Sequence, residues 1–340
     1  MHRSEITIDL GALRRNVRTL LRVLDGSQLW VVVKANGYGH GAVDAAGAAL
    51  GSGATALCVA TIPEGLALRN EYRVERIIVL GPAGSNREIA QARDAALELA
   101  IADGEIPEGV RVHLKLDTGM GRYGLSELPV PPAEVVGLMM HFATADSDAA
   151  FARAQLERFR AATDEYGHLT RHAANSAATL RLPESHFDAV RCGGAIYGLS
   201  PFNTDPGEDG LEPVLSWQSS LAQVKQLQAG ESTGYGRRFI GAEPTWIGIV
   251  PVGYGDGFSR DLTGTEVRVA GEPRPVIGTV SMDSFAVQLH RELPVGAPVV
   301  ILGHGMLAEA HARVAGTINY DLVCRIQSGP LRARRTVIDA

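Results

Sequence analysis

The segment from Val31 to Gly41 joins a lysine to a loop that contains three glycines and reads Val-Val-Val-Lys-Ala-Asn-Gly-Tyr-Gly-His-Gly. A short β-branched run brings Lys34 to the end of a predicted strand, and Tyr38 lies among the glycines. A lysine amine there can condense with a carbonyl, and glycine backbone N–H groups can approach an anion. The segment alone is equally compatible with a solvated lysine in a turn between a strand and a helix.

Reactive side chains also follow several later apolar segments. The fifth segment leads to Lys115 and Arg122, and the sixth ends at His141. The seventh and eighth carry the remaining candidates, which are His172, Asn175, Ser176, Arg191, Gly193 and Gly194. In a parallel barrel, chemistry takes place where the strands end. Their shared position therefore favours a common site over separate structural roles.

The elements that must position these residues are eight short apolar segments, most of them separated by enough chain for a helix. This pattern predicts an α/β fold, a (β/α)8 TIM barrel. The segments are Leu29–Ala35, Ala56–Thr61, Arg76–Leu80, Ala96–Ile101, Val110–Asp117, Val135–Phe142, Leu169–Asn175 and Ala189–Gly194. Helical spacing is clear in Asp9–Leu24 and Asp148–Tyr166.

A phosphate site is expected at the ends of strands seven and eight, where many barrels bind phosphate. Asn175-Ser176 and Gly193-Gly194 offer hydroxyl and backbone donors, and Tyr38 adds a phenol. Lys34 on the neighbouring strand would meet the carbonyl end of the phosphorylated molecule. The simplest cofactor with both features is pyridoxal 5'-phosphate, with Arg191 able to reach the far edge of its ring.

A dinucleotide site is the rival interpretation. Gly37-x-Gly39-x-x-Ala42 follows a predicted strand and opens a predicted helix, as a nucleotide-binding turn does. Such a match alone is weak. The acidic residue expected about 20 positions later could only be Glu64, which lies behind Pro63. This interpretation also leaves the residues at the other strand ends without a role.

The chain changes character after about Leu199. Pro201 to Gly210 is a polar connection, and short alternating runs separated by turns follow it. We therefore expect a barrel domain over 9–210 and a β-rich domain over 1–8 plus 211–340. The second domain offers Tyr254 in a glycine-flanked loop, together with Met282 and Tyr320.

Composition limits the class of protein. The 340 residues are 45% hydrophobic and 21% charged, as in a globular protein, and the net charge of −6 gives no reason to expect nucleic acid or membrane as a partner. Cys58, Cys192 and Cys324 are too far apart for a metal knuckle and fit a reducing compartment. With no apolar leader and no long apolar segment, the expected location is the cytoplasm.

Taken together, the motifs resemble those of the alanine racemases. Val31–Gly41 resembles the cofactor-lysine signature of that family, and further blocks follow in the family's order over nearly the whole chain. The most specific is Leu114–Arg122; the others are His141–Asp146, Ala174–Ala178, Val190-Arg191 with Tyr197-Gly198, Val252–Tyr254 and Ser281–Asp283.

The resemblance implies a homodimeric enzyme with pyridoxal phosphate and a small amino-acid substrate. Lys34 would be the Schiff-base lysine and one catalytic base, and Tyr254, reaching the other subunit's barrel, would be the second. His141 matches the histidine that hydrogen-bonds this tyrosine, with Arg191 and His172 behind it. Arg191 also matches the arginine that faces the pyridine nitrogen.

The remaining site residues follow from the same resemblance. The cofactor contacts would be made by Tyr38, His172, Asn175, Ser176, Gly193, Gly194 and Tyr320. Arg122 and Met282 match residues near the substrate carboxylate. Lys115 matches a position that is carbamylated in many members, where it braces Arg122.

Two departures affect the wall of the site. Cys192 stands where proline is common, and Ser281 where cysteine or asparagine is frequent. Substrate breadth therefore stays open between alanine and serine. A non-catalytic barrel that binds pyridoxal phosphate in a homeostatic role is a further alternative, which the second domain disfavours because such proteins are usually a barrel alone.

Overall fold

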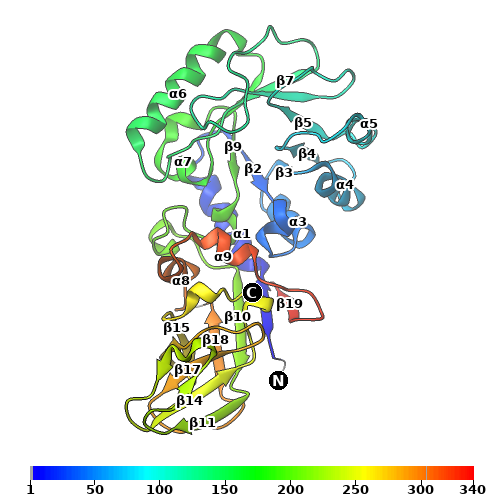
Figure 1. Ribbon diagram of the computed structural model, residues 1–340. Coiled ribbons are helices and arrows are strands. Elements are labelled where there is room, and N and C mark those ends of the chain that lie inside the picture. The colour runs from blue at the N-terminus through cyan, green and yellow to red at the C-terminus, as the bar shows by residue number, and fades with distance from the viewer. Residues whose placement is uncertain (1–2, 304) are drawn as a thin grey trace. The chain divides into compact units, whose positions relative to one another are not determined.

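The computed structural model describes residues 3–303 and 305–340 (Figure 1). The chain forms two compact units. The barrel unit comprises Leu13–Ile196 and Asp209–Leu211. The sheet unit comprises Met1–Ala12, Tyr197–Glu208 and Glu212–Ala340.

Eight parallel strands close into a barrel in the barrel unit, which confirms the expected α/β barrel (Figure 1). Each strand is short and mostly apolar because both of its faces are covered. The strands are β2 Gln28–Val32, β3 Ala56–Val59, β4 Arg76–Val79, β5 Glu98–Ile101, β6 Val112–Lys115, β7 Val135–Met139, β8 Thr170–His172 and β9 Ala189–Cys192.

Most of the connections between barrel strands contain helices, and two do not. In the described part of the chain, β5–β6 and β6–β7 are joined without a helix. The helices are α1 Leu10–Arg22, α2 Lys34–Tyr38, α3 Ala42–Leu50, α4 Ile62–Glu71, α5 Asn86–Asp94, α6 Ala149–Thr163 and α7 Ser176–Arg181. Over residues 3–303 and 305–340, none of the helices is both long and apolar enough to cross a bilayer.

The turn that follows Lys34 has the opposite hand to an ordinary helix. Ala35 and Asn36 both have φ of 52°, Gly37 has 63° and Tyr38 has 53°. Left-handed backbone costs a non-glycine residue about 1–2 kcal/mol because Cβ approaches the next carbonyl oxygen. Such a turn persists only where its surroundings hold it.

Glu64 provides part of that hold. One carboxylate oxygen, Oε1, accepts the backbone N–H of Ala35 at 2.7 Å. The other, Oε2, accepts the N–H groups of Ala60 at 2.8 Å and Thr61 at 3.2 Å, where it completes the capping box that starts α4. The residue that the dinucleotide interpretation would need for a ribose therefore ties the left-handed turn to the next helix.

The sheet unit is built on a nine-stranded sheet in the order β11-β14-β17-β16-β15-β18-β10-β1-β19. Residues alternate between buried and exposed along several strands, so one face covers the core of this unit. The sheet strands are β1 Glu5–Asp9, β10 Leu215–Ser220, β11 Gln223–Leu227, β14 Thr245–Val250, β15 Glu266–Val269, β16 Glu272–Ile277, β17 Phe285–Leu289, β18 Pro298–Leu302 and β19 Arg334–Ile338. A small hairpin, β12 Ser232–Thr233 and β13 Phe239–Ile240, and the helices α8 Ala308–Ala315 and α9 Asn319–Cys324 complete the unit.

Because Glu64 bonds the left-handed turn as well as capping α4, replacing Glu64 should destabilise the fold more than replacing its capping-box partner Thr61. Glu64→Ala removes the acceptor of three backbone N–H groups and should lower the free energy of unfolding by about 2–3 kcal/mol. Thr61→Ala removes one cap bond, leaves the left-handed turn tied, and should cost about 1 kcal/mol. Urea unfolding of both variants measures the difference, and equal losses would show that Glu64 acts only as a cap.

Candidate functional site

Polar side chains gather where the barrel strands end, as the sequence predicts. Lys34 follows β2, and Lys115 and His172 are the last residues of β6 and β8. His141 lies two residues beyond β7, and Arg191 lies within β9, where its side chain is 4% exposed. This rim of the barrel unit is the candidate active site.

The Arg191 guanidinium is held by five acceptors. Its Nη1 donates to the carbonyl of His172 at 2.6 Å and to His172 Nδ1 at 2.9 Å. Its Nη2 donates to the carbonyls of Met140 at 2.7 Å and Ala173 at 3.2 Å, and to His141 Nδ1 at 3.4 Å. All of its hydrogen bonds to the described residues leave from these two nitrogens. Nε is therefore the donor that remains for a ligand.

Burial and positive charge keep the nearby histidines neutral. Burial, followed by the charge of Arg191, lowers the pKa of both His141 and His172 well below its ordinary value. Arg122, Lys115 and Lys34 lower the pKa of His141 further, which places four cations around this rim. Such a concentration of positive charge favours an anionic ligand.

Lys115 is nearly buried beside this cluster. Burial, then the charges of Arg122 and Arg191, lowers the pKa of its amine to about 8. Arg122 itself lies on an exposed loop, whose turn is closed by Asp117 as it accepts the backbone N–H groups of Gly119 at 2.9 Å and Met120 at 2.8 Å. A fraction of Lys115 is therefore neutral and nucleophilic near pH 7.

The expected phosphate contacts from the barrel unit also meet. Ser176 Oγ accepts the backbone N–H of Gly193 at 3.2 Å. A Cβ on Gly193 would lie 2.4 Å from Tyr38 Oη, so only glycine lets the phenol approach this backbone. Asn175 uses its side chain to cap α7, accepting the N–H of Ala178 at 3.0 Å, and so fixes the start of the helix on which Ser176 lies.

These donors fit a phosphorylated aldehyde cofactor. Two hydroxyls and a glycine backbone suit a phosphate, while Lys34 supplies an amine and Arg191 Nε a remaining donor. The missing Cβ at Gly193 lets the Tyr38 hydroxyl lie against this backbone, which brings the two donors together. The residues present therefore agree with pyridoxal phosphate.

In the sheet unit, the loops that carry Tyr254 and Met282 are bonded to each other. Tyr254 N–H donates to the carbonyl of Ser281 at 3.0 Å, and Gly255 N–H donates to that of Met282 at 2.9 Å. A Cβ on Gly253 would lie 2.2 Å from the Ser281 oxygen, so this approach requires glycine. The two loops are therefore joined into one platform.

The Asp256 carboxylate holds this platform in place. This buried group accepts the N–H of Gly253 at 2.9 Å and pairs with Arg3 at 2.7 Å and Arg332 at 3.0 Å. Arg332 also pairs with Asp283 at 3.0 Å. The Tyr254 ring nevertheless stays 43% exposed, so its backbone is fixed while its side chain is accessible.

Tyr320 lies on α9 of the same unit. Asn319 Oδ1 accepts the Tyr320 N–H at 2.8 Å, while Asn319 Nδ2 donates to Glu309 Oε1 at 2.7 Å. Glu309 is buried, and burial raises the pKa of its carboxyl above the ordinary value. Tyr320 is thus placed by a buried hydrogen-bond network.

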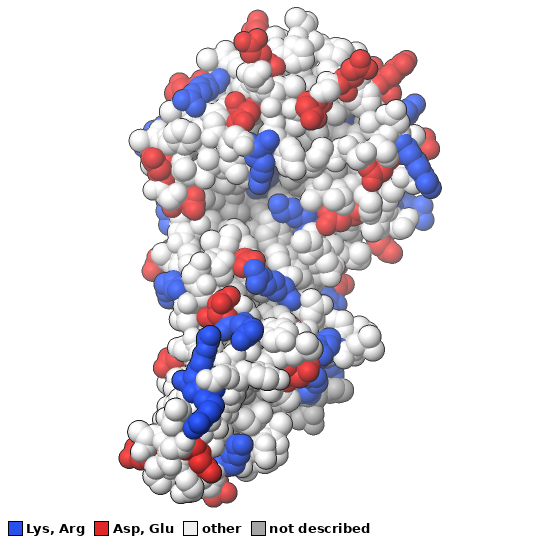
Figure 2. Space-filling model, in the orientation of Figure 1, with Lys and Arg blue, Asp and Glu red and all other residues white. Residues whose placement is uncertain are grey.

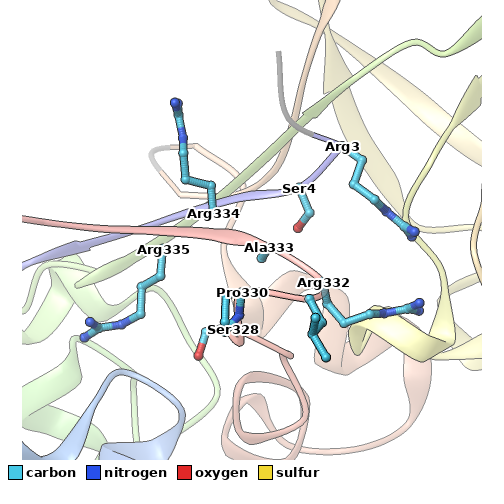
Figure 3. A pocket seen from close by; sticks show the side chains of 9 residues that line it. Arg3, Ser4, Ser328, Pro330, Arg332, Ala333, Arg334 and Arg335 are labelled. Carbon is cyan, nitrogen blue, oxygen red and sulfur yellow. The ribbon is translucent and has the colours of Figure 1, made fainter.

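An arginine-rich hollow in the sheet unit does not resemble a built anion site. Figure 3 shows Arg3 and Arg332 extending to one side, while Arg334 and Arg335 point in other directions. Arg3 and Arg332 pair with Asp256, and Arg334 pairs with Glu5 at 2.9 Å. Acidic and basic side chains are also interspersed over much of the face in Figure 2.

Two buried polar residues near the rim were not singled out in the sequence. His113, in β6, is hydrogen-bonded through Nδ1 to His172 Nε2 at 2.9 Å. Gln155, in α6, accepts the N–H of Ala143 at 2.9 Å and so holds the loop after β7. The available signals were the alternation that puts His113 on the same side as Lys115, and a glutamine at a core position of an amphipathic helix.

Family comparison covers both parts of the chain. The family model for the alanine racemase N-terminal domain matches residues 8–201, and that for the alanine racemase C-terminal domain matches residues 214–335. The chain belongs to the alanine racemase family. An alanine racemase of Symbiobacterium thermophilum is 39% identical over 94% of this chain and 93% of its own length.

Solved structures show the same membership. A biosynthetic alanine racemase from Pseudomonas aeruginosa is 34% identical with a TM-score of 0.91, covering 99% of this chain and 100% of that chain. An alanine racemase from Streptomyces lavendulae is 35% identical with a TM-score of 0.90, covering 100% and 98%. Both likenesses extend over the barrel unit and the sheet unit of this chain.

The cradle predicts that Gly193→Ala weakens cofactor binding. The new methyl group overlaps Tyr38 Oη and must displace the phenol or the backbone. We expect the Kd for pyridoxal phosphate, titrated into the apoprotein, to rise at least tenfold, or about 1.4 kcal/mol. Gly167→Ala is the matched control, because a Cβ there meets nothing within 4 Å. A Kd within twofold of wild type for Gly193→Ala would contradict the cradle.

The neutral histidines predict loss of stability in mild acid. The folded-state pKa is lowered for His113, His141, His172 and His311, so the unfolded chain binds protons first as pH falls below about 6.5. Between pH 7 and 5, the free energy of unfolding should fall by up to about 1.4 kcal/mol per pH unit for each histidine that stays neutral. Urea unfolding at several pH values tests this, and His311→Gln should reduce the slope by one histidine's share. A flat profile would refute it.

Proposed function

We propose that this chain is a pyridoxal phosphate-dependent alanine racemase that interconverts L-alanine and D-alanine. The observation that carries the proposal is the meeting of Lys34, Arg191 and the Ser176–Gly193 cradle at one barrel rim, in a chain that matches both family domains. By family resemblance, the product would supply D-alanine for bacterial peptidoglycan in the cytoplasm.

Each end of the cofactor has a defined set of residues in this proposal. Tyr38, Ser176, Gly193 and Gly194 would hold the phosphate, with Asn175 orienting Ser176. By family resemblance alone, Tyr320 would add a phenol. Lys34 binds the carbonyl carbon. Arg191, backed by His172, would donate from Nε to the ring nitrogen.

The reaction needs two proton carriers on opposite faces of the substrate Cα. When bound, pyridoxal phosphate supplies the electron sink for negative charge at that carbon. Lys34 removes or delivers the α-proton on one face, and Tyr254 of the partner subunit does so on the other. His141 accepts a hydrogen bond from Arg191 at Nδ1 and donates from its other nitrogen toward that phenol, which makes the phenolate less costly.

Arg191 sets the outcome of the reaction. Burial lowers the pKa of its guanidinium only to about 10, so it stays charged at neutral pH and donates rather than accepts. It therefore holds the ring nitrogen unprotonated. With that nitrogen unprotonated, less negative charge would spread into the ring, which would favour return of the proton to Cα.

The chain is proposed to act as a homodimer with shared sites. The domain over 9–210 would hold the cofactor, and residues 1–8 plus 211–340 would complete the partner's site. Tyr254 and Met282 support this because they are 43% and 53% exposed on a platform that is otherwise well bonded. Exposed apolar side chains on such a rigid surface suit a second copy of the chain.

Arg122 and Met282 are proposed to contact the substrate carboxylate. Lys115 would brace Arg122 after its neutral amine adds to CO2, forming an N–C bond and releasing one proton. The lowered pKa of Lys115 supports this carbamylation. A high-resolution crystal structure that shows an unmodified amine at Lys115 would refute the carbamylation.

Replacement of Lys34 tests the cofactor. The visible absorbance of lysine-bound pyridoxal phosphate should be present in the wild-type chain and disappear on borohydride reduction. It should also be absent from Lys34→Ala. An unaltered spectrum in Lys34→Ala would overturn the assignment of this lysine. Turnover of L-alanine compared with L-serine then measures substrate breadth.

Replacement of Tyr254 tests the second base. Tyr254→Phe keeps the ring but removes the ionisable hydroxyl, so the cofactor should still bind while exchange of the α-proton with solvent is lost on one face. Deuterium incorporation starting from each alanine enantiomer measures this. Full racemase rates in both directions would show that the two-base assignment is wrong.

A further inference from the structure

A buried hydrogen-bond chain crosses the barrel interior from Arg191 to Glu98. Arg191 Nη1 and His172 Nδ1 are 2.9 Å apart, His172 Nε2 and His113 Nδ1 are 2.9 Å apart, and His113 Nε2 and Glu98 Oε2 are 2.8 Å apart. Both imidazoles are fully buried and Glu98 is 3% exposed. Glu98 is the first residue of β5, so it lies at the rim opposite the candidate active site.

The groups at the two ends of the hydrogen-bond chain determine which atom donates and which accepts at each step. A guanidinium can only donate, so His172 Nδ1 must accept and His172 Nε2 must carry the proton. His113 Nδ1 then accepts, and His113 Nε2–H donates to Glu98. A carboxylate can only accept, so the sequence of donors ends there without conflict.

The neighbouring strand β7 and its register with β6 leave space for the His113 ring. A Cβ on Gly137 would lie 2.3 Å from His113 Nδ1, so β7 leaves space for the ring only because this residue is glycine. The pairing of β6 with β7 also shifts register between Val112 and His113. Trp30 packs against both imidazoles, with ring centroids 5.8 Å from His113 and 4.6 Å from His172.

Glu98 is held as a carboxylate by groups on the far rim. Arg76 Nε donates to Oε2 at 2.7 Å, and Arg111 pairs with Oε1 at 3.3 Å. Although burial opposes it, bonds from His113 and Arg76 keep the pKa of Glu98 below its ordinary value. The acceptor at the end of the chain is therefore permanent at neutral pH.

We propose that Glu98 is a positioning residue of the active site, which fixes the tautomers of His113 and His172 and so holds Arg191 for its ligand. Without the carboxylate, His113 Nε2–H has no acceptor. If His113 changes tautomer, its Nδ1–H meets His172 Nε2–H. If His172 changes too, its Nδ1–H meets the Arg191 donor, so every arrangement leaves an unsatisfied or opposed donor.

The proposal rests on the proposed function only where Arg191 faces pyridoxal phosphate. The tautomers of the histidines are a property of the apoprotein and can be measured whether or not the chain racemises alanine. Failure of the Lys34→Ala test would therefore leave this part standing.

Three variants of the full-length chain separate positioning from folding. Glu98→Met removes the acceptor at similar volume, whereas Glu98→Gln keeps one acceptor oxygen for His113. Arg76→Met is the matched control, since it removes the other donor to Oε2 and leaves the histidine chain intact. Nitrogen-15 NMR of the histidine rings reports the tautomers, and titration with pyridoxal phosphate gives the Kd.

In Glu98→Met, the His113 and His172 resonances should change from single tautomers to a mixture, and the Kd should rise about tenfold. Glu98→Gln and Arg76→Met should keep the wild-type tautomers and a Kd within twofold, even where Arg76→Met lowers the melting temperature. A folded Glu98→Met with wild-type tautomers and Kd would overturn the proposal.

Glu98→Asp covers the case in which Glu98→Met does not fold. It keeps the charge but draws the carboxylate back by one methylene, so the bond from His113 Nε2–H lengthens. The proton resonance of His113 Nε2–H should then shift upfield and that of His172 Nε2–H should follow. Unchanged resonances for both rings would overturn the proposal.

Discussion

The buried guanidinium of Arg191 is the constraint on which the barrel rim depends. A cation removed from water needs hydrogen-bond acceptors, because unpaired burial of a charge costs several kcal/mol. The chain supplies backbone carbonyls from the ends of β7 and β8 and two neutral imidazoles. These bonds draw the two strand ends and both histidines into one arrangement. The positive charge that remains at the rim then defines which ligands suit the site.

The fold could be predicted from the sequence where one physical signal dominated. Short apolar segments separated by helical spacing indicated the barrel, because strands covered on both faces must be apolar. Strand β16 was harder to recognise because Pro273 and Pro275 interrupt its pattern, yet it pairs with β15 through these residues. The candidate site residues of the barrel could be predicted as polar groups at strand ends, whereas the roles of Lys34 and Tyr254 in chemistry rest on resemblance.

What the sequence could not give was the contact between residues far apart in the chain. Glu64 appeared only as a poor ribose ligand, because its bond to Ala35 spans 29 positions. The hydrogen-bond chain from Glu98 to Arg191 joins residues of four strands, β5, β6, β8 and β9, and no local sequence pattern indicates it. Gly137 shows the same limit, because glycine is required there only by the His113 ring of the neighbouring strand. Local residue preferences predict helices and strands. A polar network can be recognised only once the barrel has brought its residues together.

The left-handed turn after Lys34 also has a consequence for the order of folding. Ala35 and Tyr38 each disfavour this backbone by about 1–2 kcal/mol, so the isolated segment does not favour it. Glu64, on α4, supplies one of the bonds that hold the turn, and that bond forms only once α4 is in place. We therefore expect the turn to form late in folding, so that substitutions within it give φ-values near zero. On this expectation, the segment that carries Lys34 takes its native shape after the barrel strands around it have paired.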